Sequence, residues 1–576
     1  MFQHPPRVLA PGLTVSAQTP TWHLFVPKLF TTLRRGYSLD SLKADSIAGL
    51  TVAVVALPLA MALAIASGTT PDKGLHTAII AGFLISALGG SRVQVGGPTA
   101  AFIPVVFVVI QQFGYGGLIL CTLLAGLILI AAGLLRLGTL MKYMPQPVIT
   151  GFTAGIAVSI FLSQLKDALG LKIERLPAEF LQRVELYAQH VSSLNIWAAL
   201  ICLGCLALII ALRRWRPRWP GLLIAVVGGT LVCSLLHLPV NTIGSSFGTI
   251  PSALPQFEFP VIPFHRTAEL LPAALTIAFL AGVESLLSAV VADGMTGGKH
   301  RSNAELVAQG VANCGSALFG GLPATGAIAR TATNIRSGAR TPMAGVLHAV
   351  FLLVFMLSLA PLMSYVPLSA LAAVLLMVAW NMSEVHRFRQ LLKSPRGDAA
   401  VLLVTFVLTV AVDLTVAIEV GVVMAAFLFM HRMSSVVAME SDLDFLEQDV
   451  DDLSRPASDN QQARLPAGVA AFRISGPLFF AVANRLDDVL NQYPDKPKVF
   501  ILRMRQVPLI DASGAAAIEQ FLDRCRRSGM RVILSGAAPQ VRATLRAMGI
   551  SEHPTLLGLS DNFEQALQAA AGEVGD

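Results

Sequence analysis

The sequence predicts a mainly α-helical membrane protein that ends in a small α/β domain, and three observations predict this architecture. Of the 576 residues, 54% are hydrophobic and only 13% are charged, whereas a soluble protein carries about 25% charged residues. Long, nearly charge-free apolar runs follow one another from about residue 46 to residue 432. After residue 467 the pattern changes to short β-rich runs (GVAAFRI, KVFILRM and RVILS) that alternate with helical stretches at 481–492, 513–528, 538–548 and 561–571.

The apolar runs have the length of membrane-spanning helices, because each is close to the ~20 residues that cross roughly 30 Å of hydrocarbon. The stretch 398–432 could be one overlong helix, but its basic flanks, Arg396 and Arg432, favour two short spans that turn near Asp413. We therefore expect about fourteen spans. They begin near residues 46, 74, 98, 117, 147, 195, 220, 268, 304, 325, 342, 366, 398 and 414.

The basic residues collect in alternate loops, as the positive-inside rule requires of cytoplasmic loops. We therefore expect a multi-pass protein of a bacterial inner membrane with both termini in the cytoplasm. The net charge of +7 then reflects orientation in the lipid bilayer, and no nucleic-acid partner is expected. The cytoplasmic basic residues are Arg34, Arg35, Arg136, Lys142, Arg213, Arg214, Arg216, Arg218, Lys299, Arg301, Arg336, Arg340, Arg387, Arg389, Lys393 and Arg396.

No cofactor or metal is expected. The six cysteines are scattered, and the Cys202/Cys205 pair lies on a predicted membrane helix, where packing is the simpler role. The sequence contains no P-loop, so ATP is not expected to drive the protein, and it is not expected to be an enzyme.

Two glycine- and proline-containing motifs resemble each other: VGGPTA at 95–100 and GGLPATG at 320–326. Each predicts irregular, extended backbone followed by a helix that begins inside the membrane, at Pro98 or Pro323. Irregular backbone at that depth must line a cavity, and two facing helix N-termini form an anion site. The alternative is that both motifs are glycine-lined contacts between helices.

Two charged residues lie inside predicted spans, where an unpartnered charge is costly. Arg330 is expected to add positive charge to the anion site, or else to pair with a carboxylate or backbone carbonyls. Glu284 has no basic residue on its own span, so it is expected to exchange a proton and thereby couple transport to protons. A fixed salt bridge is the alternative for Glu284.

Four segments of the chain resemble the sulfate permease (SulP) family, and the tail resembles its STAS domain; the resemblance covers about residues 40 to 571. Within that family the likeness is greatest to bacterial four-carbon dicarboxylate transporters, through LPLAMALAI, the DGMTG run and LLMVAWNMSE (375–384). The four segments are DSIAGLTVAVVALPLAMALAIASG (45–68), GGSRVQVGGPTAAF (89–102), GVESLLSAVVADGMTGGKHRSNAELVAQGVAN (282–313) and GGLPATGAIARTATN (320–334).

The resemblance implies a seven-plus-seven inverted repeat, a core domain that moves against a gate domain as an elevator, and a homodimer. It places the substrate site between the third and tenth spans and puts the coupling carboxylate at Glu284. Some relatives carry serines where this chain has Ala327 and Ala329, so backbone N–H groups and Arg330 are left to hold the anion. The implied substrate-binding residues are Thr99, Ala100, Ala327, Ile328, Ala329 and Arg330.

The tail carries Asp511-Ala512-Ser513-Gly514, which is similar to the STAS loop that bears a phosphorylatable serine. Ser513 is therefore a candidate regulatory site, since a phosphate there would lie at a helix N-terminus, and the domain could bind a cytoplasmic regulator. The alternative is that Ser513 is a helix N-cap.

Together these features predict four segments: a cytoplasmic N-terminal segment (1–40), a transport domain (41–435), a charged linker (436–466) and the STAS domain (467–576). The leading functional hypothesis is proton-coupled uptake of a small anion, with dicarboxylates such as succinate and fumarate as substrates. The alternatives are a sulfate or bicarbonate transporter of the same family, a passive anion exchanger or channel, and a membrane-tethered sensor.

Overall fold

The computed structural model describes residues 24–139, 145–173, 176–177, 179–216, 219–249, 256–257, 266–412, 414–436, 438–441, 465–466, 468–479 and 496–575. It forms two compact units, residues 1–423 and 424–576. Lys142, Arg218, Asp413, most of the expected linker and the expected helix at 481–492 lie outside the described residues.

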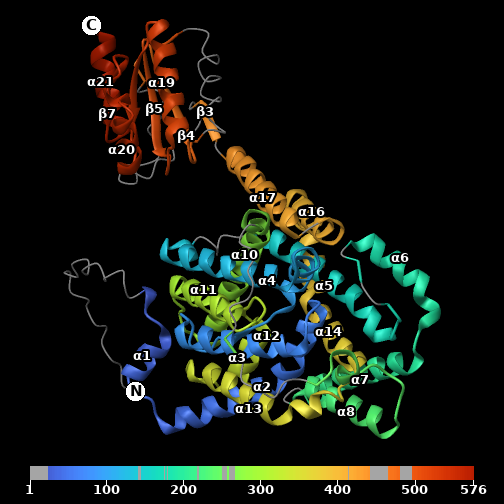
Figure 1. The fold of residues 1–576 in the computed structure, drawn as a ribbon. Helices are drawn as coiled ribbons and strands as arrows, with labels where there is room; N and C mark the ends of the chain where they lie inside the picture. Colours follow the sequence, from blue (N-terminus) through green and yellow to red (C-terminus); the bar gives the residue numbers. More distant parts are fainter. Residues whose placement is uncertain are drawn as a thin grey trace, which may run out of the picture. The chain divides into compact units, whose positions relative to one another are not determined.

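The first unit is helical, and α17 continues from it into the second (Figure 1). Its helices are α1 (Lys28–Arg34), α2 (Leu39–Ala66), α3 (Pro71–Leu88), α4 (Ile103–Leu134), α5 (Gln146–Leu169), α6 (Phe180–His190), α7 (Ile196–Trp215), α8 (Gly221–Leu235), α9 (Ile243–Phe247), α10 (Thr267–Thr296), α11 (Ser302–Leu318), α12 (Ile328–Arg336), α13 (Met343–Met363), α14 (Leu368–Met382), α15 (Val385–Leu392), α16 (Arg396–Ala411) and α17 (Leu414–Val436).

Each predicted span has a helix at its place. The first spanning helix, α2, begins at Leu39 rather than near residue 46. The helix α4 contains both the third and the fourth predicted spans, which are separated by non-helical backbone at Gly114. The stretch 398–432 forms two separate helices, α16 and α17, and not one overlong helix; of these, Thr415–Met433 of α17 is long and apolar enough to cross a membrane. By length and composition, eight helices of the described residues can cross a membrane, and Gly221–Leu235 is a shorter apolar helix.

Local sequence fixes several helix ends. Ser38 caps α2 by accepting a hydrogen bond from the N–H of Ser41, and Asn195 caps α7 through the N–H groups of Trp197 and Ala198. At the other ends, Gly170 after α5 and Gly297 after α10 adopt left-handed backbone, which glycine accepts without steric cost.

The helices of the first unit pack in two groups. In the group that we call the core, α4 packs along α10 and α11, α13 packs along α2 and α3, and α12 packs against α2 and α10. In the group that we call the gate, α5 packs along α14 and α16, and α7 packs along α8 and α14. Figure 1 shows α1 and α6 on opposite sides of this unit.

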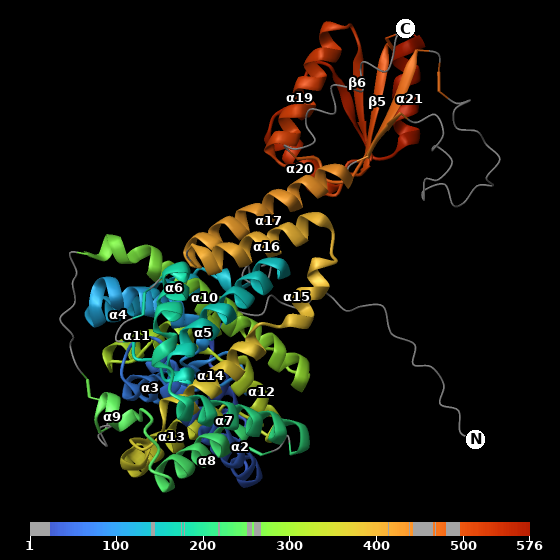
Figure 2. The ribbon, with the colours of Figure 1, turned by 90° about the vertical axis from the view of Figure 1, so that its right-hand side faces the viewer.

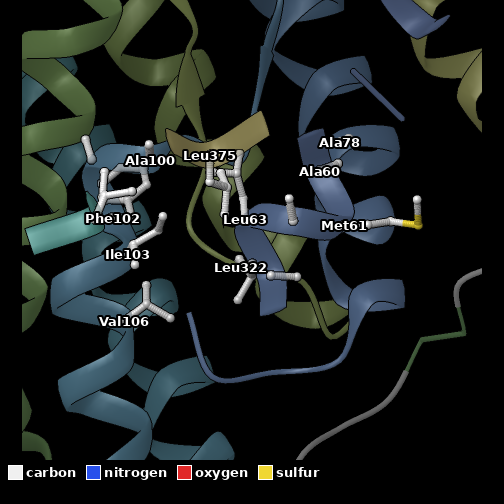
Figure 3. Packing of buried hydrophobic residues seen from close by; sticks show 14 of the residues in the cluster. Ala60, Met61, Leu63, Ala78, Ala100, Phe102, Ile103, Val106, Leu322 and Leu375 are labelled. Carbon is white, nitrogen blue, oxygen red and sulfur yellow. The ribbon is translucent and has the colours of Figure 1, made fainter. Parts of the chain in front are cut away.

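Close packing around the start of α4 depends on small and apolar residues. A Cβ on Gly74 of α3 would overlap the backbone of Ala60 on α2, so these helices approach closely only because glycine stands there. Figure 3 shows Ala100, Phe102 and Ile103 facing Leu63 of α2 and Leu375 of α14. The start of α4 is therefore held by an apolar wall built from both helix groups.

The second unit contains a five-stranded sheet of order β3-β4-β5-β6-β7, with only β3 antiparallel to its neighbour. The strands are β3 (Ala438–Ser441), β4 (Val469–Ser475), β5 (Val499–Gln506), β6 (Arg531–Ser535) and β7 (Leu556–Ser560); the helices are α19 (Ala512–Arg527), α20 (Pro539–Ala547) and α21 (Phe563–Gly575). The sequence predicted the strands β4, β5 and β6. It did not predict β7, and it did not predict β3, which lies within the expected linker.

Alternate residues of each strand belong to opposite faces of this sheet. Phe500 and Leu502 of β5 pack in one apolar cluster with Phe521 of α19, whereas Val499 and Ile501 pack in another with Ala566 of α21 and its neighbours. Figure 2 shows α19 and α21 on opposite sides of the strands. This confirms the predicted α/β domain after the membrane helices.

Candidate functional site

The two motifs with glycine and proline meet inside the core. Gly96 and Gly97 form the short strand β1, which pairs antiparallel with β2 (Thr325–Gly326). Beside this pair, the N–H of Ala327 donates to the carbonyl of Val95 over 3.0 Å. The predicted convergence of two interrupted segments is therefore confirmed, and we call this pair of segments the crossing.

Glycine is required at the crossing for steric reasons. A Cβ on Gly326 would overlap the side-chain amide of Gln94. Gly97 has a φ of +150°, and a Cβ there would overlap the guanidinium of Arg330. At both positions the backbone lies closer to a polar side chain than a residue with a Cβ atom would allow.

The helices begin later than predicted. A 3-10 turn at Ala100–Phe102 precedes α4, and α12 begins at Ile328 rather than at Pro323. Strand pairing explains the difference, because Thr325 and Gly326 use extended backbone to pair with β1 before the chain can turn into a helix. Arg330 consequently lies in the first turn of α12.

The six predicted substrate-binding residues divide into two sets. Thr99, Ala100 and Ala327 are buried at the crossing, as is Arg330. The other two, Ile328 and Ala329, are exposed on the first turn of α12. The crossing thus brings together residues from both motifs, with one cation among them.

The guanidinium of Arg330 is buried but only partly bonded. Its Nη2 donates to the carbonyl of Pro98 over 3.0 Å, which joins the start of α12 to the segment before α4. Its Nε and Nη1 are buried and, among the described residues, have no hydrogen-bond partner. Since buried donors are normally satisfied, these two atoms are available to an anion.

Glu284 of α10 lies at the same crossing. Its Oε2 accepts a hydrogen bond from the hydroxyl of Thr99 over 3.0 Å. The ion pairs found in the described part of the chain do not include Glu284 or Arg330. A fixed salt bridge, the alternative considered for Glu284, is therefore absent from those residues.

Sequence reasoning missed a buried carboxylate, Glu305 of α11, which no solvent reaches. Its Oε2 accepts from the N–H groups of Gly90 (2.8 Å) and Ser91 (3.1 Å), and its Oε1 from Ser285 (3.2 Å) and Gln309 (2.9 Å). Glu305 therefore anchors the loop that leads to the crossing.

Polar side chains satisfy the extended backbone at the crossing. The Thr331 hydroxyl accepts from the N–H of Val95 over 3.1 Å, and Asn313 bonds both the N–H and the carbonyl of Ala324 at 2.9 and 2.8 Å. Gln94 donates to the Ser285 hydroxyl over 2.8 Å. Such polar residues inside apolar runs were the signal available in the sequence.

A cavity of about 1720 Å³ lies between core and gate. It reaches Ile103 and Pro104 in the first turn of α4, next to the crossing. Its wall includes α4 of the core, α5 and α16 of the gate, and the helix α17, which belongs to neither group. Charged residues of both signs line it: Lys166, Asp167, Lys172, Glu179, Arg183, Glu269 and Glu419.

In the second unit, α19 begins next to the predicted regulatory serine. Asp511 is the N-cap of this helix, and its Oδ1 accepts from the N–H of Gly514 over 2.7 Å. Ser513 is instead an exposed residue of the first turn, so its interpretation as the N-cap is wrong. The reason is that the side chain of Asp511, two residues before Ser513, already accepts the hydrogen bond from the N–H group of Gly514 in the first turn.

Within the ranges that the structure describes, no group of three His, Cys, Asp or Glu side chains could hold a metal ion. The crossing instead offers an arginine, a threonine hydroxyl and the start of α12. Donors of these kinds are able to bind a small anion.

Comparisons with known proteins identify the family of the chain. The model of the sulfate permease family matches residues 42–405, and that of the STAS domain matches residues 460–568. "Putative sulfate transporter YvdB" of Bacillus subtilis is 41% identical over 519 residues, covering 90% of this chain and 95% of that protein. "Bicarbonate transporter BicA" of Synechocystis is 31% identical over 548 residues, covering 93% and 95%.

Solved structures show the same fold. The transmembrane domain of a cyanobacterium bicarbonate transporter BicA is 31% identical, with a TM-score of 0.61 over 67% of this chain and 98% of that chain. The overall structure of SLC26A9 is 17% identical, with a TM-score of 0.83 over 98% of both chains, and it shows the fold alone. The chain therefore belongs to the sulfate permease family of anion transporters and ends in a STAS domain.

Proposed function

We propose that this protein is a secondary transporter of a small inorganic oxyanion, sulfate or bicarbonate. The observation that carries the proposal is Arg330, whose guanidinium is buried at the crossing with two donors free among the described residues. An arginine binds oxyanions through paired N–H donors, and the start of α12 adds the partial positive charge of a helix N-terminus.

The substrate is recognised chiefly by charge. Ala327 and Ala329 offer no side-chain donor, so the backbone, Thr99 and Arg330 provide the polar contacts. Such a site discriminates weakly between oxyanions. The names of the relatives support the choice of inorganic anions: YvdB is named for sulfate and BicA for bicarbonate, so both anions are favoured over the dicarboxylates that the sequence suggested.

Glu284 is the proposed coupling group. Its carboxyl shares the crossing with Arg330, and a protonated Glu284 does not repel an incoming anion. Transport then follows from movement of the core against the gate in an elevator manner. Two observations support that step: the helices pack in two groups, and a cavity separates them beside the crossing.

The remaining assignments follow from the sequence. The alternating basic loops favour cytoplasmic termini in a bacterial inner membrane. The family favours a homodimer. The exposed position of Ser513 suits a regulatory modification or the binding of a cytoplasmic regulator by the STAS domain.

The test is uptake of labelled sulfate and labelled bicarbonate into sealed vesicles that contain the purified full-length protein. We expect saturable accumulation of one of these anions under an imposed proton gradient, and weaker competition by succinate than by the other inorganic anion. Equilibration without accumulation would favour the passive exchanger. Absence of any flux, with the protein folded, would favour the membrane-tethered sensor.

A further inference from the structure

Four cations lie close to one another around α1 and the loops that follow α3 and α10. Lys28 belongs to α1, and its N–H donates to the carbonyl of Gly89 over 3.0 Å; the N–H of Arg301 donates to the carbonyl of Gly90 over the same distance. Arg92 follows in the same loop. We call Lys28, Arg35, Arg92 and Arg301 the cationic cluster.

The carboxylates near the cationic cluster are already bonded elsewhere. Asp293 accepts from the backbone N–H and the ring Nδ1 of His300, at 2.9 and 2.7 Å. Glu305 faces the inner side of the loop, where it accepts from Gly90 and Ser91. In the described part of the chain, no ion pair involves a member of the cluster.

The members of the cluster also weaken one another's charged forms. Burial lowers the pKa of Lys28, and the positive charges of Arg301 and Arg92 lower it further. Burial likewise lowers the pKa of Arg301, with the charges of Arg35 and Arg92 acting in the same direction. A bound anion would relieve this repulsion.

The neighbouring helix surface is apolar. Phe30 and Leu33, three residues apart on α1, are 58% and 48% exposed, and Leu39 and Ile47 of α2 are 75% and 63% exposed. Lys28 and Arg35 are seven residues apart and therefore lie on one face of the helical segment. That face differs from the face of Phe30 and Leu33. A cationic face beside an apolar face is typical of a segment at the membrane interface.

We propose that the cationic cluster is a binding site for the phosphate group of an anionic phospholipid, whose acyl chains lie along Phe30 and Leu33. Arginine and lysine provide the donors that a phosphate accepts. A soluble phosphate compound would use the charges but leave the apolar face uncovered, so the lipid is the occupant that uses both features.

The test measures lipid binding to the purified full-length protein by native mass spectrometry, with phosphatidylglycerol or phosphatidylcholine added to the detergent. We expect phosphatidylglycerol to be retained in preference. The double variant K28Q/R92Q should bind it about 30-fold more weakly, since each basic residue contributes about 1 kcal/mol. The matched control R34Q/K43Q removes two exposed cations from the same end of the protein and should change binding less than threefold.

Two results would overturn the site. One is phosphatidylglycerol binding that is unchanged in K28Q/R92Q; the other is an equal loss in both double variants, which indicates diffuse attraction. Thermal stabilisation by inorganic phosphate as large as that by the lipid would overturn the choice of a lipid. Should K28Q/R92Q fail to fold in phosphatidylcholine, the single variant R92Q, at an exposed position, is expected to bind about fivefold more weakly. Unchanged binding in R92Q would equally reject the proposal.

Discussion

The hydroxyl of Thr99 donates a hydrogen bond to the carboxylate of Glu284 over 3.0 Å, although 185 residues separate the two in the chain. This contact joins the segment that opens α4 to the middle of α10. It places a carboxyl group within the same crossing as the buried cation Arg330.

Replacing Glu284 by Gln should abolish accumulation driven by a proton gradient, because an amide cannot exchange the coupling proton. Anion binding and exchange should persist, since Gln can still accept the hydrogen bond from Thr99. Labelled-anion uptake into vesicles, with and without an imposed gradient, measures both properties. Undiminished concentrative uptake by the variant would reject the coupling role.

Replacing Arg330 by Gln should lower kcat/KM for anion uptake by about 10- to 100-fold, the loss expected for hydrogen bonds to a charged group. R330K should be intermediate, because lysine keeps the charge but lacks the planar fork. R336Q is the matched control, since Arg336 is exposed on the same helix. Equal effects of R330Q and R336Q would show that only the overall charge of α12 matters.

Replacing Gly326 by Ala should destabilise the crossing by about 1–3 kcal/mol, because the added Cβ overlaps the amide of Gln94. Thermal unfolding of the purified protein measures this loss. Gly204 of α7 is the matched control, since a Cβ there meets nothing within 4 Å. If the overlap is the cause, Q94A/G326A will unfold at a higher temperature than G326A alone.

Replacing Asp511 by Ala should destabilise α19 by about 1 kcal/mol through loss of its cap, whereas S513A should change it by less than about 0.5 kcal/mol. Hydrogen exchange of peptides from residues 512–527 in the full-length protein measures both. A larger effect at Ser513 than at Asp511 would contradict the assignment of the cap.

Cys525 of α19 should resist thiol reagents in the folded protein. Burial raises the pKa of its thiol to about 12, so at pH 8 only about one molecule in ten thousand carries the reactive thiolate. The unfolded thiol has a pKa near 9, so this group should lower the stability of the second unit as pH rises from about 9 towards 12. Peptide mass spectrometry after maleimide treatment at pH 8 measures the labelling; rapid modification before unfolding would show that the thiol is accessible.

The helical fold was predictable because each span is a local apolar run with basic residues in alternate loops. The crossing was also predictable, because Gly96, Gly97 and Pro98 forbid an ordinary helix where the hydropathy demands a membrane segment. Its register was not predictable. The pairing of Gly96 with Gly326 delays the start of α12, and that contact spans more than half of the first unit's sequence.

The hydrogen-bond network behind the crossing was missed for a related reason. Glu305 lies beside His300, Arg301 and Ser302, and this polar run looks like the end of a cytoplasmic loop. Only the fold shows that its carboxylate turns inward to Gly90 and Ser91. Likewise β7 is short and contains Gly558, so little in its own sequence distinguishes it from a loop.

The backbone pairing of β1 with β2 bears on how the proposed transport cycle releases its cargo. Because the N–H of Ala327 is hydrogen-bonded to the carbonyl of Val95, the two segments of the crossing cannot draw apart without breaking main-chain hydrogen bonds. In the proposed cycle, an anion held by both segments therefore leaves when the intact site becomes exposed to the other side of the bilayer, and not through disassembly of the site.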